Sequence, residues 1–401
     1  MASRFVAVSA PERPAAWPAE ARPGVRALVA SKVREVANAG LGVAAVEAFW
    51  FGEPDEATPE FIRRAGMDSL AAGETFYAHN LGLAELRETL AAYVSRLHRP
   101  TPAEAIAVTS SGVSALMLAT QLMVGPGDRV VAVTPLWPNL VEMPRILGAE
   151  VKRVPLAFTP EGWRLDLERL LDALTPGTRA LYVNSPNNPT GCTIPREAQR
   201  ALLERCRRHG IWILADDAYE RLWFEGEGAA PSFLDLAGPE ERVIGANTFS
   251  KSWLMTGWRL GWLTVPPALA GDLAKLIEYN TSCAPVFAQR AGVVAVREGE
   301  PVIARTRARF RAARDLLVGR LRSLEGVEAA LPAGAMYAFF RIAGVTDSLA
   351  FCKRLVREHG LGLAPGAAFG PEGEGFVRWC FAASGERLEE GVRRLARALA
   401  A

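Results

Sequence analysis

Short apolar runs rich in β-branched residues alternate with helical patterns through the middle of the chain. Six such runs lie at residues 105–108, 129–133, 180–183, 211–215, 243–246 and 261–265. Strands that alternate with helices in this way are typical of a mostly parallel sheet with crossover helices. The pattern therefore predicts an α/β fold.

The segments on either side of this region have a different character. Four prolines in the first twenty-odd residues indicate an arm, and a helical pattern follows at 24–37. A glycine and proline cluster at Gly52, Pro54 and Pro59 marks a boundary. Residues 288–324 form an arginine-rich helical pattern, and 326–401 mix short strands with a final helix from Glu386. We predict an arm and the first part of a small domain at 1–50, a large domain at 51–290 and the rest of the small domain at 291–401.

Composition and charge narrow the class of protein. The 401 residues are half hydrophobic and 22% charged, which argues against disorder. Because 46 Lys and Arg nearly balance 44 Asp and Glu, no large basic footprint for nucleic acid is present, and the arginine-rich run is interleaved with acidic and apolar residues. The five cysteines contain no Cys-x-x-Cys pair, and no apolar run reaches the length of about 18 residues needed to span a membrane. We expect a soluble cytoplasmic protein without a membrane or nucleic-acid partner.

Several common catalytic motifs are missing from the sequence. It has no phosphate loop of the Gly-x-x-x-x-Gly-Lys type, no His-Glu-x-x-His and no Gly-x-Gly-x-x-Gly after a strand. The four histidines, His79, His98, His209 and His359, are scattered and have no metal-ligand spacing. We therefore expect no metal site, and we interpret the histidines as structural surface or loop residues.

The most informative segment is Asn-Thr-Phe-Ser-Lys-Ser-Trp at 247–253, which follows a predicted strand. Lys251 stands between two serines, and Arg259 follows eight residues later. A lysine whose pKa is lowered by burial near cations can attack a carbonyl as a neutral amine and form a Schiff base. Taken alone, Lys251 would be interpreted as an ordinary surface lysine, so its role has to be inferred from the neighbouring motifs.

Three further segments follow predicted strands. Asp216 and Asp217 lie at the carboxyl end of a strand, where α/β sheets bind ligands, although either could simply cap a helix. The turn at 184–191 carries amides that could hydrogen-bond a phenolic oxygen, or it is only structural. Residues 109–114 open a helix whose free N–H groups suit a phosphate, or they form a common cap.

Together, and in this order, these motifs resemble the class I/II pyridoxal-phosphate-dependent aminotransferases, which have the aspartate aminotransferase fold, fold type I of the pyridoxal-phosphate enzymes. The resemblance runs from about Gly52 to the C-terminus. It implies that the large domain binds pyridoxal 5'-phosphate and is built on a mostly parallel seven-stranded sheet flanked by helices. It also implies a smaller α+β domain formed by both chain ends.

The resemblance implies a role for each matching residue. Lys251 would form the Schiff base, Asp216 would hold the pyridine nitrogen, and Tyr219 and Asn188 would donate to the ring oxygen O3′. Trp137 would stack on the ring, although it could also be a core tryptophan. The cofactor phosphate would be bound by Ser111, Gly112, Val113, Thr248, Ser250 and Arg259.

Other matches concern the substrate and a second subunit. Arg378 resembles the arginine that grips the substrate α-carboxylate, which suits a planar guanidinium, although a lone arginine is more often a salt-bridged strand edge. Asn188 and the loop at Gly52 would also contact the substrate. Tyr77 resembles the tyrosine that reaches the phosphate in the neighbouring subunit, which implies a homodimer with shared sites.

The implied reaction is amino-group transfer between an L-amino acid and a 2-oxo acid. Val113 stands where some dicarboxylate-preferring relatives carry a lysine, and this favours a neutral or aromatic donor. Trp50, Phe51, Trp253, Met336 and Tyr337 are the candidate pocket residues for such a side chain. A C–S β-lyase or a decarboxylase on the same fold is the alternative, because the scaffold mainly selects which Cα bond breaks. A non-enzymatic, cofactor-binding regulator is disfavoured, since we see no helix-turn-helix ahead of the matching region.

Overall fold

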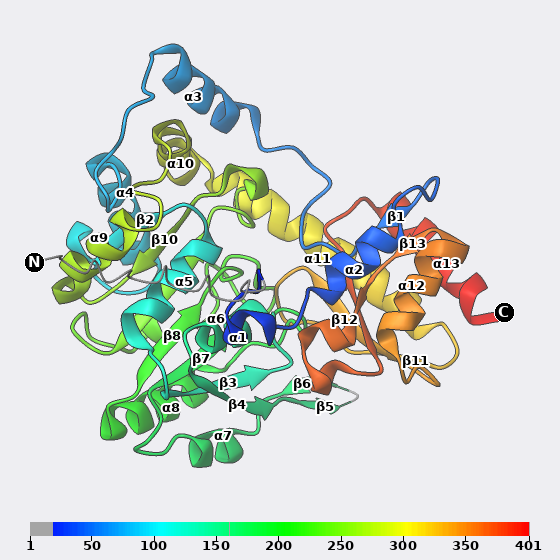
Figure 1. The fold of residues 1–401 in the computed structure, drawn as a ribbon. Coiled ribbons are helices and arrows are strands. Elements are labelled where there is room, and N and C mark those ends of the chain that lie inside the picture. Colours follow the sequence, from blue (N-terminus) through cyan, green and yellow to red (C-terminus); the bar gives the residue numbers. More distant parts are fainter. Residues whose placement is uncertain (1–18, 160, 401) are drawn as a thin grey trace, which may run out of the picture.

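The computed structural model describes residues 19–159 and 161–400 (Figure 1). The predicted arm lies almost wholly outside the described residues. A seven-stranded sheet forms the centre of the larger part, and only β10 runs antiparallel to its neighbours. In spatial order the strands are β2 (Ile106–Thr109), β10 (Gly261–Thr264), β9 (Val243–Thr248), β8 (Trp212–Asp216), β7 (Ala180–Asn184), β3 (Arg129–Thr134) and β4 (Glu150–Pro155). The predicted α/β fold with a mostly parallel sheet is confirmed.

Six of these strands match the predicted runs to within two residues at each end, and β4 is the strand that the apolar pattern missed. It lies at the edge of the sheet and pairs only with β3. Its first four side chains alternate between exposed and partly buried, with Glu150 and Lys152 exposed, and only Val154 is fully buried. An edge strand that carries charged residues between its valines has no continuous apolar run, which is why the pattern did not reveal it.

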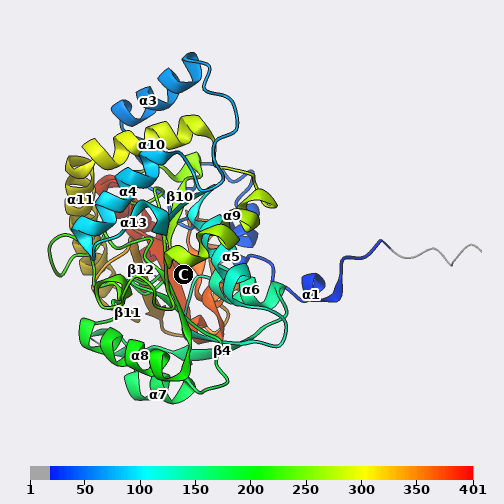
Figure 2. The same ribbon diagram turned by 90° about the vertical axis from the view of Figure 1, so that its left-hand side faces the viewer.

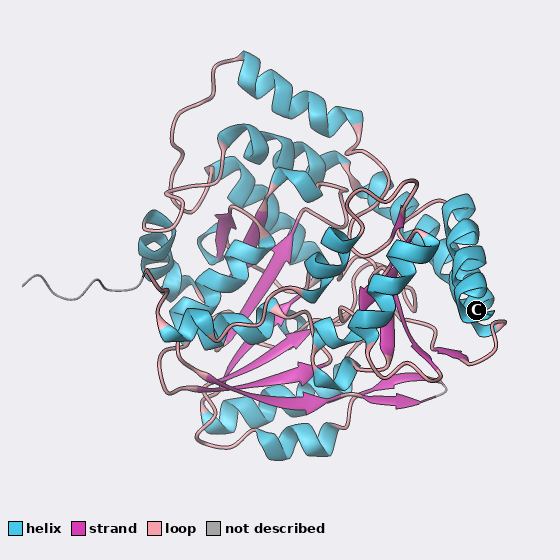
Figure 3. Cartoon of the chain, turned by 45° about the vertical axis from the view of Figure 1, so that its right-hand side comes forward, coloured by secondary structure: helices cyan, strands magenta, loops and turns pink. Residues whose placement is uncertain are grey.

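Helices cover both faces of the sheet (Figure 3). One face packs against α5 (Gly112–Met123), α6 (Asn139–Ile146) and α9 (Ala270–Glu278), and the other against α4 (Ala84–Leu97), α7 (Leu167–Ala173), α8 (Arg196–His209) and α10 (Val286–Glu298). On β7, Tyr182 points to the first layer and Leu181 and Val183 to the second. Because both faces are buried, these strands are apolar throughout rather than alternating.

A four-stranded antiparallel sheet forms the smaller part, in the order β11 (Val327–Ala329), β12 (Tyr337–Ile342), β15 (Phe376–Cys380) and β14 (Ala364–Pro365). Helices α12 (Ser348–His359), α13 (Gly385–Ala400) and α2 (Lys32–Ala39) pack on it. Strand β1 (Glu47–Ala48) pairs with β13 (Leu361–Gly362), so that the blue and the orange-red ends of the chain lie together in Figure 1. The boundaries at residues 50 and 290 stay a prediction.

Two predicted helices are each split in the structure. The helix predicted at 24–37 is divided into α1 (Pro23–Arg26) and α2, because Ser31 caps α2 by accepting the N–H of Arg34. The helix predicted at 288–324 is divided into α10 and α11 (Glu300–Arg322) at Gly299. A Cβ atom at Gly299 would lie 2.1 Å from the carbonyl oxygen of Ala295, so this junction requires glycine.

The remaining elements are short or peripheral. Helix α3 (Glu60–Ala71) packs on α10 at one end of the molecule (Figure 2). The hairpin of β5 (Ala157–Thr159) and β6 (Gly162–Arg164) packs on the smaller sheet through Phe158 and Trp163. The 3-10 helices are η1 (Ala103–Ala105), η2 (Phe233–Asp235), η3 (Thr256–Trp258), η4 (Pro267–Leu269), η5 (Gly366–Phe369) and η6 (Pro371–Gly373). Within the described ranges, no helix combines the length and apolar character needed to cross a membrane.

Candidate active site

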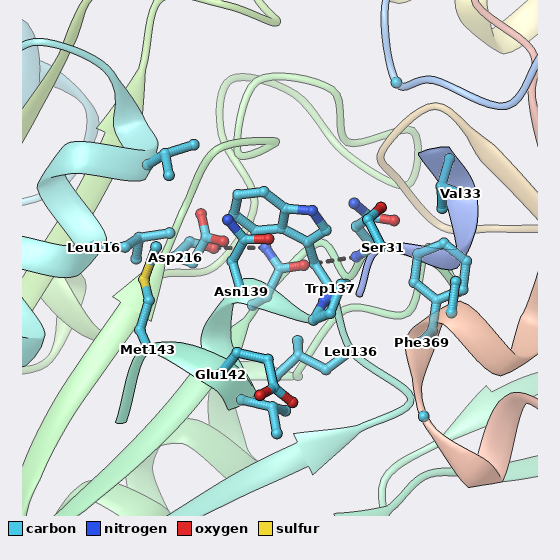
Figure 4. Close-up of a pocket in the computed structure, with 18 of the residues that line it drawn as sticks. Ser31, Val33, Leu116, Leu136, Trp137, Asn139, Glu142, Met143, Asp216 and Phe369 are labelled. Atoms are coloured by element: carbon cyan, nitrogen blue, oxygen red, sulfur yellow. Dashed lines mark hydrogen bonds between the residues drawn. The ribbon is translucent and has the colours of Figure 1, made fainter. Parts of the chain in front are cut away.

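A cavity of about 1640 Å³ lies between the two sheets, where β3, β7, β8 and β9 end. Of the predicted site residues, only Ser111 and Tyr77 do not line this cavity. The predicted residues that do line it are Gly52, Gly112, Val113, Trp137, Asn188, Asp216, Tyr219, Thr248, Ser250, Lys251, Arg259 and Arg378. Figure 4 shows Trp137 in the middle of the cavity, with Leu116 and Met143 on one side of the view and Val33 and Phe369 on the other. The carboxyl ends of parallel strands therefore gather the polar residues that the sequence singled out.

Lys251 follows β9 of the large sheet, and its side chain contacts the loop at Gly52. Its Nζ atom donates a hydrogen bond of 2.5 Å to the carbonyl oxygen of Gly52 and lies 5.8 Å from the ring centre of Tyr219. Burial lowers the pKa of Lys251 to about 8, and the positive charges of Arg378 and Arg259 act in the same direction. A large fraction of this amine is therefore neutral at slightly alkaline pH, as a nucleophile or base must be.

Asp216, the last residue of β8, is a buried carboxylate without an ion-pair partner among the described residues. It accepts only the N–H of Ala218, at 3.3 Å. Burial raises the pKa of Asp216 to about 7, although the charge of Lys251 opposes the shift. Burial of an unpaired carboxylate costs free energy, which a cationic group of a ligand would offset. Asp216 is therefore suited to bind such a group.

Tyr219 lies beside Asp216 on the segment that follows β8. Its hydroxyl is 2.7 Å from the hydroxyl of Tyr337, which comes from β12 of the smaller sheet. Burial raises the pKa of Tyr219, and Tyr337 adds to the shift, so the phenol keeps its proton. The pair thus brings a hydroxyl from each sheet to the cavity.

An anion-binding arrangement lies at the start of α5. Ser111 caps this helix by accepting the N–H of Ser114 at 3.0 Å, and Gly112 comes so close to Thr248 that a Cβ atom would lie 2.9 Å from the Cβ of Thr248. The hydroxyls of Thr248 and Ser250 are 2.9 Å apart. The guanidinium of Arg259, which donates to the carbonyl oxygen of Thr256 at 2.7 Å, lines the same cavity, so a helix N-terminus, two hydroxyls and a cation are available there, the groups that suit a phosphate dianion.

Arg378 is buried on β15 between two aromatic rings. Its guanidinium lies 4.3 Å from the ring centre of Tyr337 and 4.8 Å from that of Phe369. It donates from one terminal nitrogen to Oδ1 of Asn188 at 2.9 Å and from the other to the carbonyl oxygen of Trp50. Its Nε atom is buried without a hydrogen-bond partner among the described residues. Such a fixed fork is suited to a carboxylate.

Some residues that the sequence favoured lie elsewhere. Tyr77 is 89% exposed and does not line the cavity of its own chain. Of the five candidate pocket residues, Phe51 and Tyr337 line the cavity, whereas Trp50, Trp253 and Met336 do not. Trp253 instead packs with Tyr93, Phe249 and Trp262 in the core, and Met336 is buried beneath the smaller sheet. The sequence pattern did not show on which side of the backbone these apolar side chains lie.

Other cavity residues were missed by sequence reasoning. The segment 28–34 forms one wall, and Phe369, Leu116 and Met143 line the apolar part. Leu116 lies three residues after Val113 on α5, so helical spacing could have identified it. Phe369 and the segment 28–34 come from the smaller part and have no such signal.

Comparison with known proteins identifies the family of the chain. A model of the family described as aminotransferase class I and II matches residues 48–395. The chain is 35% identical to the arginine–pyruvate transaminase of Pseudomonas aeruginosa, over 86% of this chain and 88% of that protein. It is also 35% identical to the aspartate/prephenate aminotransferase of Thermus thermophilus, over 94% and 96%.

A solved structure shows the same fold. The aromatic aminotransferase of Pyrococcus horikoshii superposes with a TM-score of 0.83 and 30% sequence identity, over 91% of this chain and 98% of that one. The seven-stranded sheet flanked by helices is therefore that of the aspartate aminotransferase fold. Members of the matching family are typically dependent on pyridoxal phosphate. The chain belongs to the class I and II aminotransferase family.

Proposed function

We propose that this aminotransferase uses pyridoxal 5'-phosphate, held by Lys251, to move an amino group from a neutral or aromatic L-amino acid to a 2-oxo acid. One observation carries the proposal: a single cavity contains the partly neutral amine of Lys251, the unpaired carboxylate of Asp216, an anion cradle at α5 and the guanidinium of Arg378. Lys251 would react with the aldehyde of the cofactor, Asp216 would bind its pyridine nitrogen, and the N-terminus of α5 would bind its phosphate. Arg378 would bind the carboxylate of the amino acid.

The residues present fit this cofactor. Asp216 would hold the pyridine nitrogen, Asn188 and Tyr219 would donate to the phenolic oxygen, and Trp137 would stack on the ring. The phosphate would take the amides at the start of α5 and the side chains of Thr248, Ser250 and Arg259. When bound, the cofactor supplies an electron-withdrawing ring that stabilises negative charge at the substrate Cα.

Lys251 would act as the base and acid of the reaction. A neutral amine at this position could take the proton from the substrate Cα and, as the resulting ammonium, return it to the cofactor carbon C4′, two atoms away. Arg378 would hold the α-carboxylate as a bidentate pair, which fixes the Cα–H bond relative to Lys251. The loop at Gly52 would close over the substrate, since its carbonyl already binds the lysine.

An apolar side-chain pocket supports the neutral or aromatic donor. The cavity lining contains the apolar side chains of Leu116, Leu136, Met143 and Phe51, and Val113 brings no charge to it, whereas the charged residues Lys32, Arg34, Arg145 and Arg153 also line the cavity. Burying an aromatic or aliphatic side chain against these apolar side chains contributes about 1.5–3 kcal/mol.

We further propose a homodimer with shared sites. Large apolar side chains are exposed along α3, the segment 73–80 and the end of α9: Met67, Leu70, Phe76, Tyr77 and Tyr279. Asn80 donates to Glu278 and to the carbonyl of Ser282, so the last two of these surfaces are neighbours. A patch of this kind is suited to a second copy of the chain, whose cavity Tyr77 would then reach. The five free cysteines also favour a reducing compartment such as the cytoplasm.

A half-reaction screen tests the reaction and the donor class. The protein loaded with pyridoxal 5'-phosphate is mixed with each amino acid in turn, and the absorbance of the bound cofactor is followed. We expect a rapid change with aromatic and neutral donors, and none for Lys251→Ala. Lys275→Ala, a change of an exposed lysine paired with Asp272, is the matched control. A response confined to aspartate and glutamate would contradict the donor class, and release of ammonia and pyruvate from cystathionine without a 2-oxo acid would favour the lyase.

A further inference from the structure

His98 is a buried charged residue that the proposed reaction does not use. It caps the C-terminal end of α4, with only 2% of its side chain exposed. Its Nδ1 atom is 2.7 Å from Oδ1 of Asp235, and its Nε2 atom is 3.0 Å from Oε2 of Glu220. Glu220 is itself buried, and the side chain of Asp235 is 10% exposed. The histidine, expected to lie on the surface or in a loop, is thus the centre of an ion triad.

With both carboxylates ionised, the geometry requires a charged imidazole. An ionised carboxylate only accepts hydrogen bonds, so both ring nitrogens must donate, and they can do so together only in the imidazolium form. Burial opposes this charge, but the hydrogen bonds and charges of Asp235 and Glu220 outweigh it and raise the pKa of His98 to about 10. The C-terminal end of α4 also favours a positive charge.

The two carboxylates of this triad, Glu220 and Asp235, both connect His98 to the segment that carries Asp216 and Tyr219. Glu220 directly follows Tyr219. Asp235 accepts the N–H of Ser232, whose hydroxyl donates to Oδ2 of Asp217 at 2.8 Å. Asp217 directly follows Asp216. The back of the segment 216–220 is therefore tied to α4 through His98, while its front faces the cavity.

Only His98 balances the charge of Glu220. Asp235 has a second cation in Arg196, at 2.9 Å, whereas His98 is the one cation bonded to Glu220 across the described part of the chain. The neighbouring Arg221 turns instead to Glu300 and the hydroxyl of Tyr93. Arg99, next to His98, donates to the carbonyl of Ala237. Loss of the imidazolium would leave a buried carboxylate without compensation one residue from Tyr219.

We propose that His98 is a positioning residue, which holds Asp216 and Tyr219 against the cofactor ring by balancing the buried carboxylates behind them. The proposal rests on the roles given above to Asp216 and Tyr219. It predicts an effect on binding of the ring that spares binding of the phosphate, because in the described part of the chain no hydrogen bond joins Ser111, Thr248, Ser250 or Arg259 to the triad.

Binding to cofactor-free protein separates these two effects. Affinities for pyridoxal 5'-phosphate and for inorganic phosphate are measured by tryptophan fluorescence and by competition. We expect His98→Gln to weaken binding of pyridoxal 5'-phosphate about ten-fold or more and to change phosphate binding less than about two-fold. His209→Gln is the matched control, since His209 also ends a helix, α8, but joins no ion pair in the described ranges.

A rescue variant distinguishes charge balance from simple packing. His98→Gln combined with Glu220→Gln removes the uncompensated carboxylate, so we expect it to recover most of the lost affinity. Equal weakening of both ligands, or no recovery in the double variant, would overturn the proposal. If His98→Gln does not fold, Glu220→Gln alone, which leaves no carboxylate at position 220 to balance and keeps the His98–Asp235 pair, must retain most of the affinity for pyridoxal 5'-phosphate; a loss of about ten-fold or more overturns the proposal.

The same measurements separate this inference from the proposed function. Wild-type protein that binds no pyridoxal 5'-phosphate overturns both. If wild-type protein and His98→Gln bind pyridoxal 5'-phosphate equally tightly, only the positioning role is overturned.

Discussion

The guanidinium of Arg378 donates a hydrogen bond of 2.9 Å to Oδ1 of Asn188, and this bond joins the smaller sheet to the turn after β7 of the larger one. Both residues line the cavity, and they are 190 positions apart in the sequence. The same guanidinium lies between Tyr337 and Phe369. The position of the smaller sheet therefore determines where a substrate carboxylate would be held relative to Lys251.

The first prediction concerns the shape of Arg378. Arg378→Lys keeps the charge but loses the planar fork and its stacking between two rings. We expect kcat/KM for the amino donor to fall about 100-fold, equivalent to about 2.7 kcal/mol of transition-state stabilisation. Steady-state kinetics measure this loss, and Arg341→Lys, a change at the one exposed residue of β12, is the control. A change below about three-fold would contradict the carboxylate role.

The second prediction concerns the pKa of Lys251, which burial lowers to about 8. In cofactor-free protein the labelling of this amine by an amine-specific reagent should rise with pH to a midpoint near 8, because only the neutral amine reacts. The pKa of Lys275 is raised by its hydrogen bond to Asp272, so its labelling should rise only at a higher pH. Peptide mapping by mass spectrometry gives both curves in one sample. Coincident midpoints would show that Lys251 is an ordinary lysine.

The sheet and its ligand edge were predictable from sequence for a physical reason. Strands buried on both faces are continuous apolar runs, and in a parallel sheet their carboxyl ends meet at one edge. Asp216 and Thr248, each the last residue of its strand, could therefore be expected to lie close together, as could Asn188, four residues beyond the end of β7. The edge strand β4, with Lys152 and Arg153, carried no such signal.

Contacts made by the smaller part could not be predicted in the same way. The pairing of Tyr219 with Tyr337 and the stacking of Phe369 on Arg378 depend on how the second sheet docks. No local periodicity encodes that docking. The side of the backbone on which Trp253 lies was equally invisible, and it points into the core.

The third prediction follows from the pKa of Asp216, which burial raises to about 7. In the unfolded chain this carboxyl ionises near its ordinary value, so the folded state binds more protons between about pH 4 and 7, and stability is lost as pH rises through that window. Asp216→Asn should therefore raise the melting temperature of cofactor-free protein at pH 8, and less so at pH 5. It should also weaken binding of pyridoxal 5'-phosphate. Thermal unfolding at both pH values tests the sign, and lower stability at pH 8 would contradict it.

The fourth prediction concerns shared sites. If Tyr77 serves the neighbouring subunit, Lys251→Ala and Tyr77→Ala subunits complement each other, because a heterodimer contains one cavity with both residues native. After equimolar mixing under exchange conditions, we expect activity to recover to about a quarter of the wild-type value, since half of the dimers carry one native site of two. Unmixed variants, and a mixture of Lys251→Ala with itself, are the controls. Activity no greater than the sum of the unmixed variants would contradict a shared site.

The fifth prediction addresses donor choice at the start of α5. Val113 lines the cavity next to the apolar wall that contains Leu116. Val113→Lys brings a cation to that wall, so kcat/KM should rise about ten-fold for aspartate or glutamate and fall for an aromatic donor, because one new ion pair contributes on the order of 1.4 kcal/mol. Gln121→Lys adds the same charge on the exposed face of the same helix and should change neither value. Competition between the two donor classes in one reaction measures the ratio directly. If both variants leave the ratio unchanged, the side chain at position 113 does not contact the distal end of the substrate, and donor choice must come from the opposite wall formed by the segment 28–34.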